Sequence, residues 1–432
     1  MDSKIAVLGL GYIGLPTASI LAVNGFWVVG IDINAQAVEI INNGHVHIYE
    51  PGLETLVRAV TFSGHLVARR EVEPADVFII AVPTPITSQK TADLTAVSAA
   101  SEAIMPVLRE GNLVILESTV PPRTTLDLVT PILEKSGLKA GEDFQVVHAP
   151  ERVLPGQILK ELVQNDRVIG GIDQASAERA REIYNRFVSG DIHLTDATTA
   201  ELVKLVENTY RDVNIALANE LALVSDKFKT DVWEVIRLAN KHPRVNILQP
   251  GPGVGGHCIP VDPWFIVERA PCEAQLIKAS RMRNDGMPEH VCESIMDMVL
   301  GILDPKITIL GVAYKANVDD VRESPALELI DLLRARGVQV KAHDPYVYPS
   351  MSLEEAVEDA DCLAIIVNHQ DYAELDPVDI AARMRNGRLF LAIMSKNIQP
   401  WIDAGYMVRQ LGCGWTEPAP SELIEQNLFS WV

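Results

Sequence analysis

The sequence is poor in cysteine and in basic charge, and both shortages narrow the class of protein. Its 432 residues include five cysteines, and no two of them form a C-x-x-C pair. An odd, sparse set in a long chain is typical of reduced thiols, so we expect a cytoplasmic protein. Lys and Arg number 37 against 58 Asp and Glu, for a formal net charge of −21. Because such a surface repels phosphate backbones and anionic lipids, we expect neither nucleic acid nor a membrane as a partner. An anionic substrate would then need its own local cluster of basic side chains.

Long apolar runs are also missing. No stretch reaches the ~18 residues that a membrane span needs. The uncharged segment 5–23 follows Lys4 and could pass for a signal peptide, but three glycines and a proline interrupt it. At roughly 150 residues per domain, the length suggests about three domains.

The two ends of the chain share one order of elements. The N-terminal part has the apolar runs IAVLGLG, WVVGID, DVFIIAV and NLVILES, with helix-like stretches between them. The C-terminal part repeats this order with ITILGVA, VQVKAHD, DCLAIIV and RLFLAI. Short continuous apolar runs are typical of strands that are buried on both faces of a parallel sheet. Helices between such strands give βαβ units and hence doubly wound sheets.

The middle of the chain has a different pattern. Gly and Pro are both absent from the 52 residues between Asp191 and His242, and apolar residues recur at helical spacing. We predict one long helix over 197–229, with Thr195 and Asp196 as candidate N-caps, and a second helix over 232–240. The expected fold class is therefore α/β, with two Rossmann-like doubly wound parallel-sheet domains joined by a long central helix and a small helical domain. The expected boundaries are 1–194, 195–298 and 299–432, and we expect a homodimer or higher homo-oligomer through the central helix.

The N-terminal domain carries a dinucleotide-binding motif. Gly9, Gly11 and Gly14 form G-x-G-x-x-G after a predicted strand and at the start of a helix, and Asp32 ends the next strand. The glycines would let a pyrophosphate approach the helix N-terminus, and Asp32 would accept hydrogen bonds from ribose hydroxyls. Because positions 33–37 contain no Arg for a 2′-phosphate, NAD is favoured over NADP. The alternative is a glycine turn that binds nothing.

Two further strand ends in this domain carry threonines. Thr84 lies in AVPTP and Thr119 in ESTVPP. Ligands bind beyond the carboxyl ends of strands in open α/β sheets, so both can contact the cofactor. Their position alone is equally compatible with simple turn capping.

A glycine-rich loop precedes one of the cysteines. In GPGVGGHCIPVDPWF, four glycines come before Cys258, and Asp262 follows four residues later. A thiolate attacks carbonyl carbon well, so a cysteine near NAD suggests aldehyde oxidation through a thiohemiacetal and a thioester. The loop could instead serve only to turn the chain around a buried cysteine. Because His257–Cys258 lacks further ligands nearby, we expect no metal site.

The predicted long helix carries a polar stripe. Glu201, Lys204, Asn208 and Arg211 lie on one face at i, i+3, i+7 and i+10. Charged stripes usually face solvent. The flanking positions are strongly apolar, however, and a desolvated Lys has a lowered pKa and can act as an acid or base.

Several long motifs resemble one enzyme family. ESTVPP, APERVLPG, ELVKLVENTYRDVNIALANEL, GPGVGGHCIPVDP and GVAYKANVDDVRESP are similar to segments of the nucleotide-sugar 6-dehydrogenases, the UDP-glucose/GDP-mannose dehydrogenase family. The resemblance covers nearly the whole chain. PERVLPG, NDRVIGG and ANKHPRVNILQPGPGVGGHC are most similar to the subgroup that acts on UDP-N-acetyl-D-mannosamine.

The resemblance implies a four-electron oxidation of the C6 hydroxymethyl group of a UDP-sugar to a carboxylate, with NAD as cofactor. The product, UDP-N-acetyl-D-mannosaminuronate, would serve surface polysaccharide synthesis. By analogy Cys258 is the nucleophile, Lys204, Asn208 and Asp262 handle protons and oxyanion charge, and Glu151 activates water.

The resemblance also implies two sets of ligand contacts. The NAD contacts would be Gly9, Gly11, Tyr12, Ile13, Gly14, Asp32, Thr84, Thr119 and Arg322. The substrate contacts would be Arg152, Val153, Lys204, Asn208, Arg211, His242, Arg244, Gly255 and Lys315. One departure is Arg123, where many relatives have Gly; it adds a phosphate contact or follows a different turn.

Three alternatives stay open. The sugar could be UDP-N-acetylglucosamine, UDP-N-acetylgalactosamine or UDP-glucose. A two-electron hydroxy-acid dehydrogenase can share the Rossmann domain and a pair like Lys204 and Asn208, but it needs no cysteine. A non-catalytic NAD-dependent sensor is the third possibility.

Overall fold

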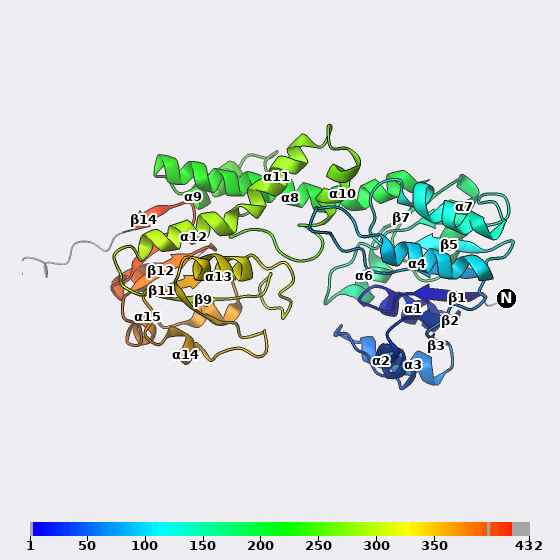
Figure 1. Ribbon diagram of the computed structural model, residues 1–432, viewed down its shortest axis with the longest axis horizontal. Coiled ribbons are helices and arrows are strands. Elements are labelled where there is room, and N and C mark those ends of the chain that lie inside the picture. Colours follow the sequence, from blue (N-terminus) through cyan, green and yellow to red (C-terminus); the bar gives the residue numbers. More distant parts are fainter. Residues whose placement is uncertain (1–2, 395–397, 417–432) are drawn as a thin grey trace, which may run out of the picture. The chain divides into compact units, whose positions relative to one another are not determined.

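The structure is a computed structural model that describes residues 3–394 and 398–416, and the chain divides into two units (Figure 1). Unit 1 comprises residues 1–207 and 264–274, and unit 2 comprises residues 208–263 and 275–432. The three-segment division expected from the sequence stays a prediction. Among the described helices, none is long and apolar enough to cross a membrane.

Unit 1 is built on an eight-stranded sheet in the order β3-β2-β1-β4-β5-β6-β7-β8. Its strands are β1 (Lys4–Leu8), β2 (Trp27–Ile31), β3 (Leu66–Arg69), β4 (Val77–Ile80), β5 (Leu113–Leu116), β6 (Gln145–His148), β7 (Arg167–Gly171) and β8 (Ile192–Asp196). All neighbouring strands are parallel except β6 and β7, which pair antiparallel. The first six strands therefore form the predicted doubly wound sheet, and the last two extend it in the opposite direction.

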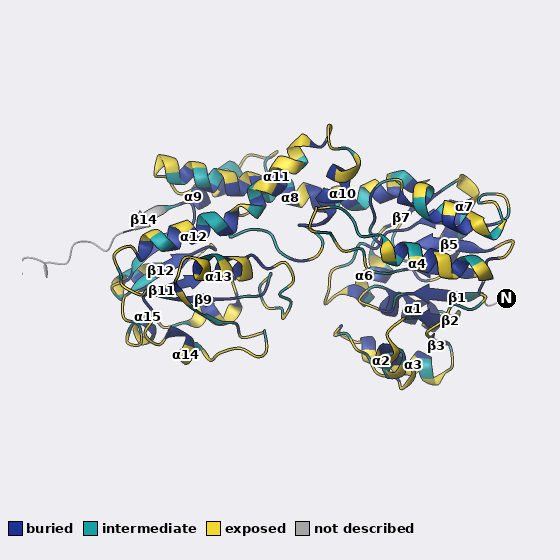
Figure 2. Ribbon diagram, viewed as in Figure 1, coloured by how far each residue is buried: buried dark blue, intermediate teal, exposed yellow. Residues whose placement is uncertain are grey.

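Helices cover both faces of this sheet. They are α1 (Gly14–Val23), α2 (Ala35–Asn42), α3 (Leu53–Phe62), α4 (Thr95–Ile104), α5 (Thr130–Leu133), α6 (Ile158–Gln164), α7 (Gln174–Tyr184) and the short turns η1 (Met105–Val107), η2 (Thr125–Val129) and η3 (Glu134–Ser136). Alternate strand residues enter different cores: Ile5 and Val7 lie in one apolar cluster, and Ala6 and Leu8 lie in the other. Figure 2 shows the central strands of this sheet as buried, and every residue of β4, β5 and β7 is buried. The continuous apolar runs are thus explained by burial on both faces.

Unit 2 is built on a six-stranded sheet in the order β10-β9-β11-β12-β13-β14. Its strands are β9 (Lys306–Leu310), β10 (Gln339–His343), β11 (Cys362–Ile365), β12 (Arg388–Leu391), β13 (Met407–Gln410) and β14 (Gly414–Thr416). Only β13 and β14 pair antiparallel. Its helices are α9 (Val232–Ala239), α11 (Gln275–Asp285), α12 (Met287–Met298), α13 (Pro325–Ala335), α14 (Leu353–Val357), α15 (Pro377–Ala381), α16 (Gln399–Asp403) and the turn η4 (Gln370–Glu374). The predicted second Rossmann-like domain is confirmed.

One long helix, α8 (Ala197–Phe228), runs from unit 1 into unit 2. Asp196 caps its N-terminus, because its carboxylate accepts from the backbone N–H and the hydroxyl of Thr199. Lys229 adopts a left-handed φ of 56° and ends the helix, and Asp231 caps α9 two residues later. The prediction of two successive helices is confirmed. The chain passes between the units twice more, after residue 263 within α10 (Asp262–Arg269) and again after residue 274.

Candidate active site

The glycine turn after β1 has the geometry of a pyrophosphate cradle. Gly9 has a φ of 90°, and a Cβ there would lie 2.6 Å from the carbonyl oxygen of Ala81. A Cβ on Gly14 would lie 1.8 Å from the carbonyl oxygen of Gly9. A Cβ on Gly11 would have no neighbour within 4 Å. Gly9 and Gly14 are thus required by the turn itself, whereas Gly11 keeps open the space that a phosphate group would enter.

Asp32 stands beside this turn at the end of β2. One carboxylate oxygen accepts from the backbone N–H of Leu10 and the other from that of Asn34, both at 2.9 Å. Each oxygen retains a lone pair for a ribose hydroxyl. Since β1 lies between β2 and β4, where the strand order reverses, the residues occupy the switch point where dinucleotides bind. The chain's own residues therefore fit NAD.

The two threonines lie at the carboxyl edge of the same sheet. The hydroxyl of Thr84 donates to the backbone carbonyl oxygen of Thr119 at 2.7 Å. The hydroxyl of Ser118 donates to the backbone carbonyl oxygen of Val82, also at 2.7 Å. These bonds tie the loop after β4 to the loop after β5. Tyr12 and Ile13 directly precede α1; the side chain of Tyr12 is exposed and that of Ile13 is half-buried. Arg322 belongs to unit 2, and its contact with NAD stays a prediction.

Glu151 belongs to a buried charge cluster that the sequence did not reveal. Its carboxylate lies 2.6 Å from Nη2 of Arg167 and accepts the backbone N–H of Arg152. The same guanidinium lies 3.6 Å from Glu117, whose carboxylate also accepts the hydroxyl of Tyr184. Burial raises the pKa of Glu117 to about 7, although Arg167 opposes this rise. One feature of the sequence could have indicated this cluster: Glu117 is a charged residue that directly follows an apolar strand.

The other predicted residues of this region have separate partners. Arg152 forms an ion pair with Glu207 at 2.7 Å, and Val153 packs against the apolar core. Arg123 has a φ of 73°, which explains why a relative could carry Gly at this position, and its guanidinium is paired with Asp127. Both alternatives for Arg123, a phosphate contact or a different turn, stay predictions.

Glu201, the first residue of the polar stripe on α8, is hydrogen-bonded to the segment at the start of η2. Its buried carboxylate accepts the backbone N–H groups of Arg123 and Thr125 and the hydroxyl of Thr125. Burial raises the pKa of Glu201, and the hydrogen bonds from Thr125 act against that rise. This stripe residue thus holds the start of η2.

The glycine-rich loop before Cys258 lies against the loop after β9. A Cβ on Gly255 would lie 2.7 Å from the carbonyl oxygen of Glu323 and 2.8 Å from Cβ of Tyr314. Gly256 has a φ of 87° and donates its N–H to the carbonyl of Arg322 at 3.0 Å. The glycines are needed because two backbone segments meet here without room for side chains.

Cys258 itself is half-buried. Its sulfur lies 3.2 Å from Nδ1 of His257. Its carbonyl oxygen accepts the backbone N–H groups of Val261 and Asp262, so one tight turn joins the thiol to the start of α10. The described residues contain no group of three or more His, Cys, Asp or Glu that could hold a metal ion.

Asp262 is linked to the α8 stripe through Asn208. The side-chain amide of Asn208 donates to its carboxylate at 2.5 Å, and Arg211 donates to the side-chain oxygen of Asn208. Asp262 is 3% exposed and Asn208 is 2% exposed. Three predicted site residues thus form one hydrogen-bonded chain in unit 2. Lys204 precedes Asn208 by one turn of the same helix but belongs to unit 1.

The remaining predicted substrate residues are exposed in loops of unit 2. His242 and Arg244 lie between α9 and the glycine-rich loop, and Lys315 lies in the loop after β9. Asn240 holds the first segment through two hydrogen bonds with the backbone of Ile247, and Asn214 bonds to Asn246 and Leu248. These asparagines could not be identified from the sequence, because a half-buried amide has no distinctive pattern.

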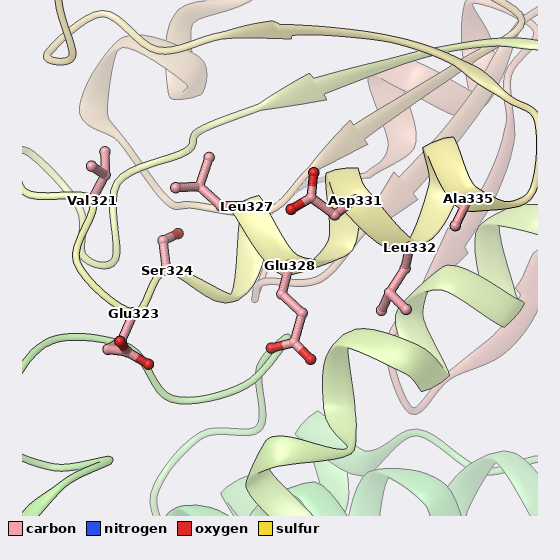
Figure 3. Close-up of a pocket in the computed structure, with 8 residues that line it drawn as sticks. All are labelled: Val321, Glu323, Ser324, Leu327, Glu328, Asp331, Leu332 and Ala335. Atoms are coloured by element: carbon pink, nitrogen blue, oxygen red, sulfur yellow. The ribbon is translucent and has the colours of Figure 1, made fainter. Parts of the chain in front are cut away.

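A groove beside α13 does not suit the substrate. Figure 3 shows three carboxylates, Glu323, Glu328 and Asp331, among its lining side chains. Carboxylates repel a diphosphate, and the lining includes no basic residue. We assign no ligand to this groove.

A glycine cradle at a switch point with an acidic residue for the ribose defines a dinucleotide-binding Rossmann domain. Residues 3–188 match the NAD binding domain of the UDP-glucose/GDP-mannose dehydrogenase family, 198–286 match its central domain, and 308–395 match its UDP binding domain. The chain belongs to this family. The family and the NAD cofactor predicted from the motifs are thereby confirmed.

Similar proteins span nearly the whole chain. The UDP-N-acetyl-D-mannosamine dehydrogenase of Methanocaldococcus jannaschii is 51% identical over 424 residues, which cover 96% of this chain and 97% of that protein. The NDP-N-acetyl-D-galactosaminuronic acid dehydrogenase of Ralstonia nicotianae is 47% identical, over 88% and 94%. The solved UDP-D-ManNAc dehydrogenase of Pyrococcus horikoshii has a TM-score of 0.89 at 42% identity, over 95% and 99%.

Proposed function

We propose that this chain oxidises UDP-N-acetyl-D-mannosamine at C6 to UDP-N-acetyl-D-mannosaminuronate, a precursor of surface polysaccharide. The observation that carries the chemistry is the Cys258 thiol, which a glycine-rich loop presents beside His257 and one turn before the Asn208–Asp262 pair. The similarity to the Methanocaldococcus jannaschii enzyme supports the choice of sugar.

The overall change consumes one alcohol, one water and two NAD⁺, and it yields one carboxylate, two NADH and three protons. Bound NAD⁺ supplies the hydride acceptor for each oxidation. Between the two oxidations the Cys258 thiolate adds to the aldehyde carbon, which retains the aldehyde as a thiohemiacetal. After the second oxidation a thioester remains, and water releases the acid and restores the thiol.

The polar residues have distinct proposed roles. Lys204 takes the proton of the C6 hydroxyl, and Asn208 donates to the oxygen on which negative charge develops. Asp262 accepts a hydrogen bond from the amide of Asn208 at 2.5 Å and so fixes the direction of that amide. In this proposal Asp262 also handles protons, through a water molecule that it would bind. Glu151 activates the water that cleaves the thioester.

Several of the proposed substrate contacts are basic, although acidic residues outnumber basic ones in the whole chain. In a protein with a net charge of −21, the UDP diphosphate needs nearby cations, and the proposed contacts Lys204, Arg211, Arg244 and Lys315 are all basic. The other proposed contacts are Arg152, Val153, Asn208, His242 and Gly255.

We also propose that α8 mediates a homodimer. Tyr210, Leu217, Val224 and Phe228 are all exposed, and their spacings of seven, seven and four residues place them on one face of the helix. An apolar stripe of this kind is typical of a helix that packs against another helix. Light scattering should give twice the chain mass, and a Leu217→Glu variant should give the monomer mass. We further propose a cytoplasmic location, because five cysteines in a chain of 432 residues are an odd, sparse set that is typical of reduced thiols.

The test of the function is an NADH count across four UDP-sugars. We expect two NADH per UDP-N-acetyl-D-mannosamine, and a kcat/KM about tenfold or more above those for the N-acetylglucosamine, N-acetylgalactosamine and glucose nucleotides. One NADH per sugar would indicate a two-electron dehydrogenase. NAD binding without turnover of any UDP-sugar would indicate a non-catalytic sensor. The N-acetylgalactosamine nucleotide is the sharpest competitor, given the similarity to the Ralstonia protein.

A further inference from the structure

The two sheets repeat one hydrogen-bonding device at their first turns. In unit 2, Gly311 donates its N–H to the carbonyl of His343, as Gly9 does to Ile31 in unit 1. In unit 2, the carboxylate of Asp344 after β10 accepts the backbone N–H of Val312 at 2.7 Å. This is the counterpart of the bond between Asp32 and Leu10. The turn that binds a nucleotide in unit 1 therefore has a structural copy in unit 2.

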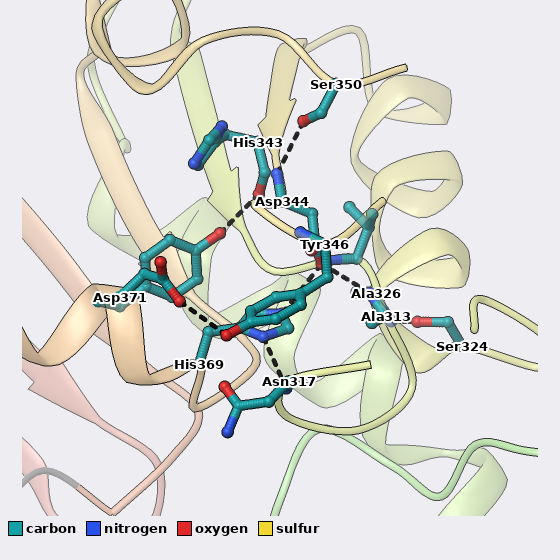
Figure 4. A network of polar contacts seen from close by, with 12 residues as sticks. Ala313, Asn317, Ser324, Ala326, His343, Asp344, Tyr346, Ser350, His369 and Asp371 are labelled. Atoms are coloured by element: carbon teal, nitrogen blue, oxygen red, sulfur yellow. Dashed lines mark hydrogen bonds and ion pairs between the residues drawn. The ribbon is translucent and has the colours of Figure 1, made fainter. Parts of the chain in front are cut away.

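The copy differs because side chains fill its ribose position. Asp344 is only 1% exposed, and the Oδ2 atom that accepts from the loop also lies 3.0 Å from Nε2 of the fully buried His369 (Figure 4). The ring of Tyr346 stacks on His369 with 5.0 Å between centroids, and Tyr372 meets its edge. Asp344 is thus committed to internal contacts and has no face for a ribose.

The second nitrogen of His369 holds a backbone group. Nδ1 lies 2.9 Å from the backbone nitrogen of Asn317. A backbone N–H can only donate, so Nδ1 must accept, and the ring proton must lie on Nε2 and point at Asp344. The backbone N–H of Gln370 in turn donates to the side-chain oxygen of Asn317. His369 and its neighbour therefore clamp Asn317 in its left-handed conformation, with a φ of 60°.

The clamped residue lies in the loop that meets the glycine-rich segment. Tyr314 and Lys315 precede Asn317 by three and two residues. The ring of Tyr314 lies directly against Gly256, because a Cβ on Gly256 would lie 2.9 Å from the Cε2 atom of Tyr314. Farther along this loop, the backbone carbonyl oxygen of Arg322 accepts the N–H of Gly256. A shift of Asn317 would thus move both the proposed substrate contact Lys315 and the support of the Cys258 loop.

We propose that His369 is a positioning residue for the UDP-sugar: its Nδ1 holds the backbone N–H of Asn317 and so fixes the 312–323 loop that presents Lys315. This inference rests on the proposed function, which makes Lys315 a substrate contact. His369 itself acts only through the loop.

Two substitutions separate the contacts of the two ring nitrogens. The side-chain oxygen of a His369→Asn variant falls near the Nδ1 position and can still accept from Asn317. A His369→Gln variant places its amide near the Nε2 position, so it can serve Asp344 but leaves Asn317 without its acceptor. In calorimetric titration of the full chain with UDP, we expect His369→Gln to weaken binding about tenfold and His369→Asn less than threefold. The KM for NAD should stay within twofold of the wild type in both variants.

Equal UDP affinity in the wild type and His369→Gln, or equal weakening in both variants, would overturn the proposal. A measurement on the unmodified protein adds a test that does not depend on folding of the variants. Long-range proton–nitrogen NMR spectra of histidine-labelled protein should show the ring proton of His369 on Nε2, and a proton on Nδ1 would refute the clamp.

UDP titration also keeps the two proposals distinct. If the wild type oxidised no UDP-sugar while the variants still differed in UDP affinity, the proposed function would fail and the clamp would stand.

Discussion

The side-chain amide of Asn208 donates a hydrogen bond to the buried carboxylate of Asp262, with 2.5 Å between Nδ2 and Oδ2. The two residues are 54 positions apart, one on α8 and one at the start of α10. Because Arg211 donates to the oxygen of the same amide, the amide orientation is fixed and its NH₂ group must face Asp262. This arrangement joins the polar stripe of α8 to the turn that carries Cys258.

An Asn208→Asp substitution should disable this arrangement. It would place two carboxylates at hydrogen-bonding distance in a buried site, where both cannot stay ionised. We expect kcat for NADH formation to fall about 100-fold, with a KM for NAD within twofold of the wild type. An Asn185→Asp variant, which adds the same charge at an exposed position of unit 1, should keep full activity. A normal kcat in Asn208→Asp would remove this amide from the catalytic machinery.

A Cys258→Ser substitution tests the covalent step. A serine hydroxyl is far less ionised than a thiol at neutral pH and is a poor nucleophile without an activating base. We expect uronate formation to fall by about 1,000-fold or more, while UDP affinity by calorimetry stays within threefold. Cys272, which is exposed, provides the matched control, and Cys272→Ser should retain full activity. Uronate formation by Cys258→Ser at the wild-type rate would mean that no thioester lies on the route.

Two alanine substitutions should separate the structural glycines from the cofactor glycine. A methyl group at Gly14 would lie 1.8 Å from the carbonyl oxygen of Gly9, so we expect Gly14→Ala to lose about 3 kcal/mol of stability or more. A methyl group at Gly11 meets no protein atom within 4 Å, so stability should change by less than about 0.5 kcal/mol. The Gly11 methyl would nevertheless occupy the path of the pyrophosphate, and we expect the KM for NAD to rise about tenfold. Thermal melting and initial rates measure both effects, and unchanged NAD affinity in Gly11→Ala would contradict the cradle.

The sequence predicted those features that depend on local pattern. The mainly apolar runs at 5–8 and 307–310 predicted strands, because strands buried on both faces consist mostly of apolar residues. Thr308 is the exception, and its buried hydroxyl donates to the carbonyl oxygen of Ala356. The absence of Gly and Pro between Asp191 and His242 predicted the long helix, since these two residues are the strongest helix breakers. The spacing of the glycines predicted the cradle, because the close contacts that require glycine in this turn include one between Gly9 and Gly14, which are near each other in the sequence.

Features that depend on distant partners could not be predicted in this way. The run at Arg167–Gly171 looks like any other strand, so its antiparallel pairing with β6 was not foreseen. Spacing on the helix placed Glu201 and Asn208 on one face but could not tell that Glu201 caps a turn while Asn208 meets Asp262. The network of Glu117, Arg167 and Glu151 joins residues up to 50 positions apart, and such pairing exists only in the folded chain.

The last prediction concerns Glu117 and the pH dependence of stability. Burial raises the pKa of Glu117 to about 7 in the folded chain, against 4.5 as its ordinary value. Between these values the folded state binds more protons than the unfolded state, so stability should fall as the pH rises from about 4.5 to 7. At about 1.4 kcal/mol per pKa unit, reduced because Arg167 and Glu151 are coupled to this group, the loss should be about 1–3 kcal/mol.

A Glu117→Gln variant should lack this loss, so its thermal midpoint should decline less than that of the wild type between pH 5 and pH 7. Buried His148, whose pKa is lowered by burial to about 3, has the opposite effect, because stability rises as the unfolded histidine loses its proton. Its contribution is common to both proteins, so the difference between them isolates Glu117. A Glu102→Gln variant, altered at an exposed position, should follow the wild-type curve. If Glu117→Gln followed that curve as well, Glu117 would have to be ionised in the folded chain at pH 5.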